Sequence, residues 1–131
     1  MVRRLHFGRA VDQRGAFGKR GEDLACDELQ RLGYTILDRR FRTRNGELDI
    51  VARDGNVVVF VEVKARSTGN FGHPFESVTR QKRHRLSRMA ASYLFVKRLS
   101  GVACRFDVVA VTGSAEPFTV QILQGAFDWN G

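Results

Sequence analysis

The sequence predicts one α/β domain in which two helices and about five strands follow the order α-β-β-β-α-β-β. Two observations support this fold class. Residues 17–32 and 78–97 carry apolar side chains at helical spacing, whereas the segments between and after them are short, β-branched and bounded by glycine or polar turns. The length of 131 residues, 43% of them hydrophobic, is enough for one domain with its own core.

The first helix is expected to end at Gly33, which suits the left-handed position after a helix. Ala25 and Leu29 mark its buried stripe, and Glu22 lies on the same stripe. An acid there either belongs to a functional site or is a first-turn acid that the helix dipole favours while its carboxylate stays hydrated. The helix by itself leaves these two interpretations open.

The strongest strand signal is a hairpin that runs from residue 45 to residue 66. Asp54 and Gly55 lie between two β-branched, apolar runs, and this pair suits a tight turn with positive φ. Residues 57–61 are apolar at every position, which indicates a central strand that is covered on both faces.

Charged residues interrupt this hairpin at positions that share one face. Glu47 and Asp49 are two residues apart on the first strand, and Glu62 and Lys64 are two apart on the second. A two-residue turn at the aspartate-glycine pair puts Asp49 opposite Phe60 and Glu47 opposite Glu62. Asp49 and Glu62 are then diagonal neighbours, and a cation could lie between them.

A hairpin with one solvated face is the simpler alternative, because such faces often carry Glu and Lys. The apolar run at 57–61 argues against it, since an exposed face would alternate along its whole length. Acids and a lysine inside core-like strands are costly to bury without a metal, a partner or a substrate. We therefore expect Asp49 and Glu62 on one face of the sheet, against Glu22 of the first helix.

Basic residues gather on both sides of this hairpin. A short strand at 34–37 leads into an arginine-rich segment at 39–44, and the second helix begins with a dense basic run that Ser77 or Thr79 can cap. A helix N-terminus beside lysine and arginine suits a phosphate group. The net charge of +8, with a pI near 10.5, favours a polyanionic partner, although a solvated basic surface is the alternative. The candidate nucleic-acid-binding residues are Arg42, Arg44, Arg80, Gln81, Lys82, Arg83 and Arg85.

The remaining segments carry weaker signals. Residues 67–75 are expected to form a loop beside the site, and His73 in this loop is a weak general-acid candidate. Strands are expected at 102–111 and 118–123; Arg105 and Asp107 share a face of the first, where a structural ion pair is preferred to a support for the site.

Residues 1–14 are rich in arginine and are expected to form a basic, flexible arm, followed by a single domain over residues 15–131. Cys26 and Cys104 lie in apolar settings typical of buried free thiols, which excludes a disulfide framework or a zinc site. The N-terminus lacks the apolar core of a signal peptide, and no apolar run is long enough to span a membrane. A cytoplasmic protein with no membrane partner is therefore expected.

Two motifs carry a family resemblance: Gly-Glu-Leu-Asp-Ile-Val at 46–51 and Phe-Val-Glu-Val-Lys at 60–64. With Glu22 ahead of them, they resemble the PD-(D/E)xK pattern of restriction-endonuclease-like nucleases, and most closely that of archaeal Holliday junction resolvases. More narrowly, the chain resembles the bacterial YraN family from about residue 15 to residue 127. The other residues that carry the match are Gly21, Leu24-Ala25, Gly33-Tyr34, Lys82, Tyr93-Leu94, Arg105-Phe-Asp-Val108 and Ala126-Phe127.

The resemblance implies a restriction-endonuclease-like fold, a central mixed β-sheet flanked by helices, with a nuclease-like domain over residues 15–131. It also implies that Asp49 and Glu62 ligate Mg²⁺ or Mn²⁺ with the backbone carbonyl of Val63, and that Lys64 orients or activates the attacking water. Glu22 would complete the acidic shell. Hard oxygen ligands suit these cations. One departure from the written pattern is residue 48, where leucine stands in the place of a proline that is not a ligand.

The leading hypothesis is a metal-dependent nuclease that hydrolyses phosphodiester bonds in DNA, either branched or single-stranded. The alternatives are a nucleic-acid-binding module without turnover and an adaptor whose basic face binds an acidic protein. The acid–acid–lysine set favours the nuclease, because a pure binder gains nothing by repelling phosphate with carboxylates. The sequence leaves a homodimer open.

Overall fold

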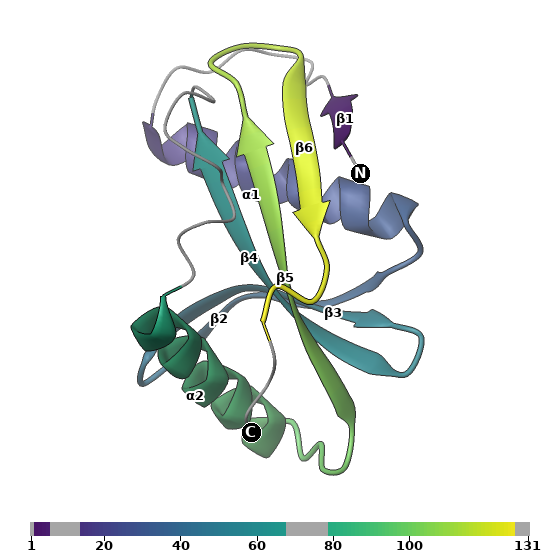
Figure 1. The fold of residues 1–131 in the computed structure, drawn as a ribbon, viewed down its shortest axis with the longest axis vertical. Helices are drawn as coiled ribbons and strands as arrows, with labels where there is room; N and C mark the ends of the chain where they lie inside the picture. Colours follow the sequence, from purple (N-terminus) through teal and green to yellow (C-terminus); the bar gives the residue numbers. More distant parts are fainter. Residues whose placement is uncertain (1, 6–13, 68–78, 128–131) are drawn as a thin grey trace.

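The computed structural model describes residues 2–5, 14–67 and 79–127, with side chains from residue 19 onward. The elements are β1 (Val2–Leu5), α1 (Arg14–Arg31), β2 (Thr35–Thr43), β3 (Gly46–Asp54), β4 (Val57–Arg66), α2 (Arg80–Val96), β5 (Ala103–Thr112) and β6 (Phe118–Leu123). From α1 onward the order is α-β-β-β-α-β-β, as predicted, and Figure 1 shows the two helices set against one twisted sheet.

The sheet has the strand order β1-β6-β5-β4-β3-β2, and it is mixed because β4 and β5 are parallel while the other neighbours are antiparallel. The α/β prediction is therefore confirmed, with one additional edge strand. Residues 2–5, which were expected to belong to a flexible arm, pair with β6 from Val2 opposite Gln121 to Leu5 opposite Phe118. Residues 6–13 of that arm lie outside the described residues.

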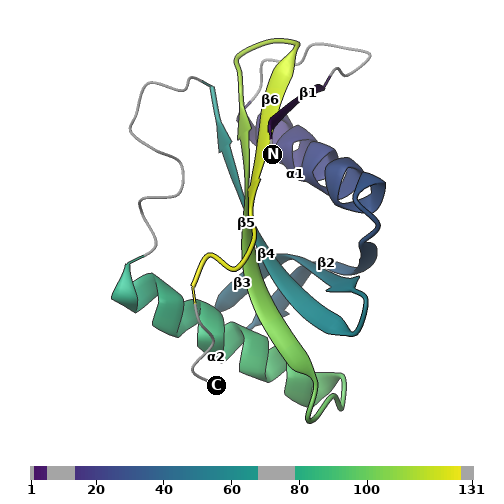
Figure 2. The same ribbon diagram turned by 45° about the vertical axis from the view of Figure 1, so that its right-hand side comes forward.

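The sheet is buried on both faces, with α1 on one side and α2 on the other (Figure 2). Strand β4 shows this alternation directly: Val59 and Val61 pack in the cluster beneath α1, whereas Val58 and Phe60 pack in the cluster beneath α2. The uninterrupted apolar run at 57–61 predicts a strand covered on both sides, and the packing confirms this.

Helix α1 begins at Arg14, three residues before the predicted start, so Glu22 lies in its third turn. The interpretation of Glu22 as a first-turn acid is therefore wrong, and its side chain belongs to the buried face, where the residue is 8% exposed. The predicted end is confirmed. Gly33 has φ of 95°, and the backbone N–H of Tyr34 donates to the carbonyl of Leu29 at 2.9 Å.

The turn of the β3–β4 hairpin differs from the prediction by one residue. Asp54 pairs with Val57, so the turn residues are Gly55 and Asn56, with φ of 60° at the glycine. This changes the predicted register: Ile50 lies opposite Val61, and the next position along β3, Asp49, comes level with Glu62 rather than with Phe60. Both turns accept the positive φ that a two-residue hairpin needs, so composition alone did not separate them.

A buried polar network surrounds Asp107 in the first half of β5. The Asp107 carboxylate accepts hydrogen bonds from Arg105 Nε at 2.9 Å, from the Tyr34 hydroxyl at 3.0 Å and from the Gly125 N–H at 3.0 Å. Arg105 also reaches Asp54 at 3.1 Å, across the hairpin turn. The structural ion pair between Arg105 and Asp107 that the sequence indicated is confirmed, and the further pair of Arg105 with Asp54 links the hairpin to β5.

Replacing Asp107 with alanine should lower the free energy of unfolding by about 3 kcal/mol, because Arg105 would lose its buried partner and the Tyr34 hydroxyl an acceptor. Asp54→Ala is the matched control: Asp54 pairs with the same guanidinium, but its side chain is 40% exposed and the loss should stay below about 1 kcal/mol. Urea denaturation of both variants checks this. Equal losses of unfolding free energy in the two variants would contradict the expectation that the buried ion pair contributes more to stability than the exposed one.

Candidate active site

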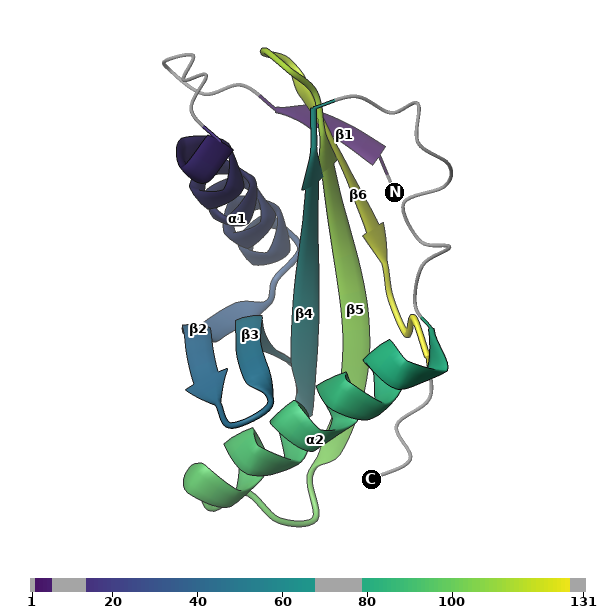
Figure 3. The same cartoon turned by 90° about the vertical axis from the view of Figure 1, so that its left-hand side faces the viewer.

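The site forms where β3 leaves β4. The ladder between these strands covers only residues 50–54 of β3, whereas β4 continues to pair with β5 as far as Arg66 opposite Thr112. In Figure 3 the β2–β3 hairpin turns aside from the long strands β4 and β5 at this end. Asp49 is the first residue beyond the ladder, and its Oδ2 accepts a hydrogen bond from the Val63 N–H at 2.8 Å. The carboxylate thus satisfies a backbone donor of β4 at the point where the strands part.

The side chains of β3 also change sides of the sheet at this point. Ile50 packs in the cluster beneath α1, whereas Leu48, two residues earlier, packs in the cluster beneath α2. A regular strand would put both on one face. As a result, Asp49 lines two hollows, one of about 230 Å³ on the α2 side and one of about 300 Å³ on the α1 side. Sequence periodicity has no signal for such a change, because it depends on how the hairpin packs.

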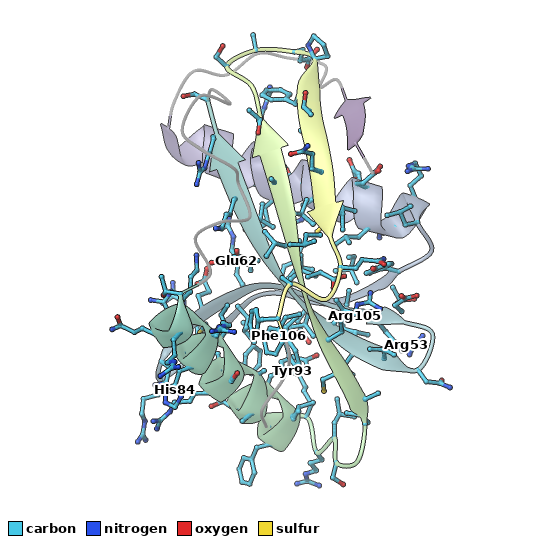
Figure 4. All side chains as sticks on the ribbon, viewed as in Figure 1. Arg53, Glu62, His84, Tyr93, Arg105 and Phe106 are labelled. Carbon is cyan, nitrogen blue, oxygen red and sulfur yellow. The ribbon has the colours of Figure 1, made fainter. Side chains whose placement is uncertain are left out.

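Glu62 lies on the α2 side of β4. Its Oε1 forms an ion pair with Lys82 Nζ at 2.9 Å, and its side chain is 18% exposed (Glu62 is labelled in Figure 4). Its Oε2 is buried and has no hydrogen-bond partner among the described residues. Buried carboxylate oxygens are almost always satisfied in folded proteins, so this one marks a position where a further donor or cation belongs.

The pKa of Asp49 reflects its burial and the neighbouring acids. Burial raises the pKa of the Asp49 carboxyl to about 6, the Val63 N–H works in the opposite direction, and the negative charges of Glu62, Glu22 and Glu47 raise it further. The carboxylates predicted for the site therefore act on one another through space. Such mutual repulsion is relieved by a bound cation.

Glu22 reaches this cluster from the α1 side, not from the side of Glu62 and Lys64. It lines the hollow that Asp49 and Val63 also line. Gly21 allows the close approach, since a Cβ there would lie 2.9 Å from the Cβ of Ala65 on β4. The expectation that Glu22, Asp49 and Glu62 share one face is therefore wrong: Asp49 lies at the junction of the two sides.

Two arginines neutralise Glu22. Arg39 Nη2 lies 3.1 Å and Arg40 Nε 3.2 Å from Glu22 Oε1, although neighbouring residues of a regular strand point to opposite faces. Arg40 has φ of 54°, and this irregularity in β2 lets both side chains reach the same carboxylate. Arg39 and Arg40 were not among the predicted site residues. Their position in an arginine run just before the acidic strand was the only available signal.

Lys64 follows Glu62 by two residues on β4 and faces α2 with it. Burial lowers the pKa of the Lys64 ammonium, and the positive charge of Lys82 lowers it further. Two ammonium groups thus lie beside the Glu62 carboxylate, one from the strand and one from the first turn of α2. Val63 lies between Glu62 and Lys64 on the opposite side of β4 and lines the Asp49–Glu22 hollow.

The raised pKa of Asp49 predicts a pH-dependent stability. The unfolded chain loses this proton near pH 3.8 and the folded chain near pH 6, so between these values the folded state binds more protons and this group lowers the stability as the pH rises. Asp49→Asn cannot ionise. It should therefore be more stable than the unsubstituted protein at pH 7, with a difference that shrinks toward pH 4. Urea denaturation in the presence of EDTA at both pH values checks this; a difference independent of pH would contradict it.

The residues present fit a divalent cation of the magnesium type. No group of three or more His, Cys, Asp or Glu close enough to hold a metal occurs within residues 2–5, 14–67 and 79–127. Mg²⁺ usually keeps several waters, however, and is held by one or two carboxylates together with substrate phosphate. Asp49 and Glu62, with the unpartnered oxygen of the latter, meet that requirement.

A basic surface borders the acids. Thr79 caps α2, its hydroxyl accepting from the Lys82 N–H at 3.1 Å, and Arg80, Gln81, Arg83 and Arg85 are exposed in the first half of the helix. A shallow hollow of about 560 Å³ joins this helix to the β2–β3 turn. It is lined by Asn45, Thr79, Gln81, Lys82, His84, Arg85 and Arg88.

Three of the predicted nucleic-acid-binding residues meet in that hollow: Gln81, Lys82 and Arg85. Arg80 and Arg83 are exposed on α2 outside it, and Arg44 is exposed next to Asn45 in the β2–β3 turn. Arg42 is 89% exposed and pairs with Glu47 at 3.4 Å. His84 and Arg88 of this surface were missed as site residues, although both belong to the basic run of the second helix. His73 lies outside the described residues.

The sequence model of the uncharacterised protein family UPF0102 matches residues 21–111. The chain belongs to this family. A UPF0102 protein of Geobacter metallireducens is 42% identical over 113 residues, covering 86% of this chain and 93% of the relative. A UPF0102 protein of Geobacter sulfurreducens is 53% identical over 95 residues (72% and 74% covered), and one of Moorella thermoacetica is 47% identical over 112 residues (84% and 93% covered).

Membership of UPF0102, the YraN family, confirms the narrower resemblance drawn from the motifs. The matched range contains the three acids and the lysine of the predicted site, Glu22, Asp49, Glu62 and Lys64, and the whole of α2. Neither helix, in the part of the chain that is described, has the length and apolar character needed to cross a membrane.

Proposed function

We propose that this UPF0102 protein is a metal-dependent nuclease that hydrolyses phosphodiester bonds in DNA, acting in the cytoplasm. The observation that carries the proposal is the pair of partly buried carboxylates, Asp49 and Glu62, where β3 and β4 part. One of them has a raised pKa, and the other has a buried oxygen without a partner among the described residues. Partly buried acids with these properties, in a hollow next to lysines and an arginine-rich helix, are candidates for a catalytic site.

Each residue has a role that follows from its position. Asp49 and Glu62 would hold Mg²⁺ or Mn²⁺, with the Val63 carbonyl as the third ligand that the resemblance to PD-(D/E)xK nucleases implies. The bound cation would neutralise charge on the phosphate and lower the pKa of a bound water. Lys64, with its pKa lowered by burial, is placed to orient that water or to stabilise developing negative charge. Glu22 keeps the arginine pair of β2 beside the acids.

The basic surface supports DNA as the substrate. The hollow lined by Lys82, Arg85 and Arg88 adjoins the acids, because Lys82 contacts Glu62 itself. The carboxylates alone would repel a phosphate backbone. A backbone that follows this hollow is neutralised by its basic side chains before it reaches the carboxylates. A homodimer would bring two such sites onto one branched substrate, and we propose it as the assembly to test alongside activity.

A cleavage panel tests the proposal. Plasmid, single-stranded, flapped and four-way-junction DNA are incubated with the protein in Mg²⁺, in Mn²⁺ and in EDTA. Cleavage of at least one substrate with either cation, and of none in EDTA, is expected. Metal-independent binding without cleavage of any substrate would favour the non-catalytic binding module. Absence of both DNA binding and cleavage would favour the adaptor that binds an acidic protein.

A further inference from the structure

The hollow on the α2 side of the site is larger than a metal and its waters require. It measures about 230 Å³ and is the more enclosed of the two hollows that meet at Asp49. Gly46 closes one end, with φ of 140°; a Cβ there would lie 3.1 Å from the sulfur of Met89 on α2. Most of its wall is apolar, formed by Leu48, Phe60, Leu86, Met89, Phe106 and Phe127.

A packing defect does not account for this hollow. Its lining also includes polar and charged residues: Asn45, Glu47, Asp49, Glu62, Arg85 and Asp107. Glu62, whose Oε2 is buried and has no partner among the described residues, lies in its wall. Apolar walls with a few convergent polar groups are typical of sites that take a small, flat, partly polar ligand.

Three aromatic residues of the wall form a row of contacting rings, one pair tilted and one pair stacked. The Phe60 and Phe106 rings lie 5.4 Å apart between centroids at 34°, and the Phe106 and Phe127 rings lie 4.4 Å apart at 23° (Phe106 is labelled in Figure 4). Phe127 follows β6, whereas the other two rings come from neighbouring strands of the sheet. Phe60 and Phe106 are 1% and 2% exposed and are covered by neighbouring rings, so Phe127, which is partly exposed at the end of this row, is the ring on which a nucleobase can stack.

The position of the hollow relative to the acids decides which ligand fits. If the scissile phosphate lies at Asp49 and Glu62, the base attached to the next sugar lies within reach of a cavity that begins at these same side chains. A base inside a duplex is held by stacking and pairing and cannot enter, whereas an unpaired base enters at little cost.

We propose that the hollow on the α2 side binds one unpaired nucleobase next to the scissile phosphate, so that the substrate class is DNA with an unpaired nucleotide at the cleavage position. The inference rests on the proposed function for the place of the phosphate. It also extends that function, because a nuclease that reads only the backbone would leave this hollow without an occupant.

Binding measured without divalent metal separates the two proposals. Fluorescence anisotropy, in EDTA and at one salt concentration, compares three duplexes: one fully paired, one with a single-nucleotide bulge, and one with an abasic bulge. The bulged duplex should bind about tenfold more tightly than the paired one, as expected for one base stacked on an aromatic side chain, and the abasic bulge should lose this advantage.

Phe127→Leu keeps an apolar side chain but removes the flat ring, so it should abolish the preference for the bulge without changing the affinity for paired duplex. Phe127→Trp should restore the preference. Phe95→Leu is the matched control, because Phe95 is 85% exposed and lines none of these hollows. Unchanged affinity for paired duplex shows that Phe127→Leu is folded.

The outcomes are distinct. Equal binding of paired, bulged and abasic duplexes, or an undiminished preference in Phe127→Leu, overturns the nucleobase site even if the protein cleaves DNA. A base-dependent preference that Phe127→Leu removes supports it even if no cation promotes cleavage, and in that case the proposed nuclease activity is the part that fails.

Discussion

Asp49→Asn and Glu62→Gln should each reduce DNA cleavage by about a hundredfold to a thousandfold or more, while binding to DNA without metal stays equal or improves. Each substitution keeps the size of the side chain and removes one anionic ligand. A cation that stabilises phosphate charge contributes several kcal/mol to the transition state, and each ~1.4 kcal/mol is a tenfold change in rate. Binding without metal should not suffer, because the substituted site repels phosphate less.

Calorimetric titration with Mg²⁺ and Mn²⁺ beside a cleavage time course measures both effects. Asp54→Asn is the matched control: it changes an acid of the same hairpin that is 40% exposed and pairs with Arg105 away from the site. Lys64→Ala should differ from the acid variants, since metal still binds while hydrolysis slows. If the unsubstituted protein binds neither cation at millimolar concentration with DNA present, Asp49 and Glu62 are not a metal site.

Replacing Lys82, Arg83 and Arg85 together with glutamine should produce the second large effect, a loss of DNA affinity that is similar for all sequences. For every phosphate that is no longer neutralised, the slope of log affinity against log salt concentration should become shallower by about 0.9 for duplex DNA. The three residues lie in the first half of α2, where Lys82 contacts Glu62 and Arg85 lines the same hollow as Asp49 and Glu62. Loss of Lys82 also frees Glu62 Oε1, so part of the weaker binding comes from restored repulsion of phosphate.

The control removes the same charge elsewhere. Arg53, Lys97 and Arg98 are exposed and lie away from the start of α2; Arg53 is on the opposite side of the molecule from His84 in Figure 4. Their replacement with glutamine should change the affinity only through net charge, with a smaller change in the salt slope. Equal effects of the two triple variants, measured by anisotropy over a series of salt concentrations, would exclude α2 as the DNA-binding surface.

Local patterns predicted the elements well. The glycine after α1, the Thr79 cap of α2 and the bounds of β6 agree with the sequence, because each depends on backbone preferences within a few residues. The strand expected at 34–37 was predicted too short. The arginine-rich segment that follows forms the second half of β2, because pairing with β3 outweighs the weak strand preference of this charged segment.

The sequence by itself identified the residues of the candidate site. Period-two alternation puts Glu62 and Lys64 on one face of β4, and helical spacing puts Glu22 on the buried side of α1. Only the tertiary structure decided how they meet. The turn at Gly55 and Asn56 sets the register, and the departure of β3 from β4 places Asp49 between the two faces of the sheet.

The same holds for the partners of the acids. The pairing of Lys82 with Glu62, the two arginines on Glu22 and the aromatic hollow beneath α2 all join residues that are distant in the chain. Such interactions follow from where α2 and the hairpin dock on the sheet, and docking is decided by the summed packing of both core clusters. No pattern within one segment contains that information, because the energy of each interaction depends on a neighbour that only the folded chain supplies.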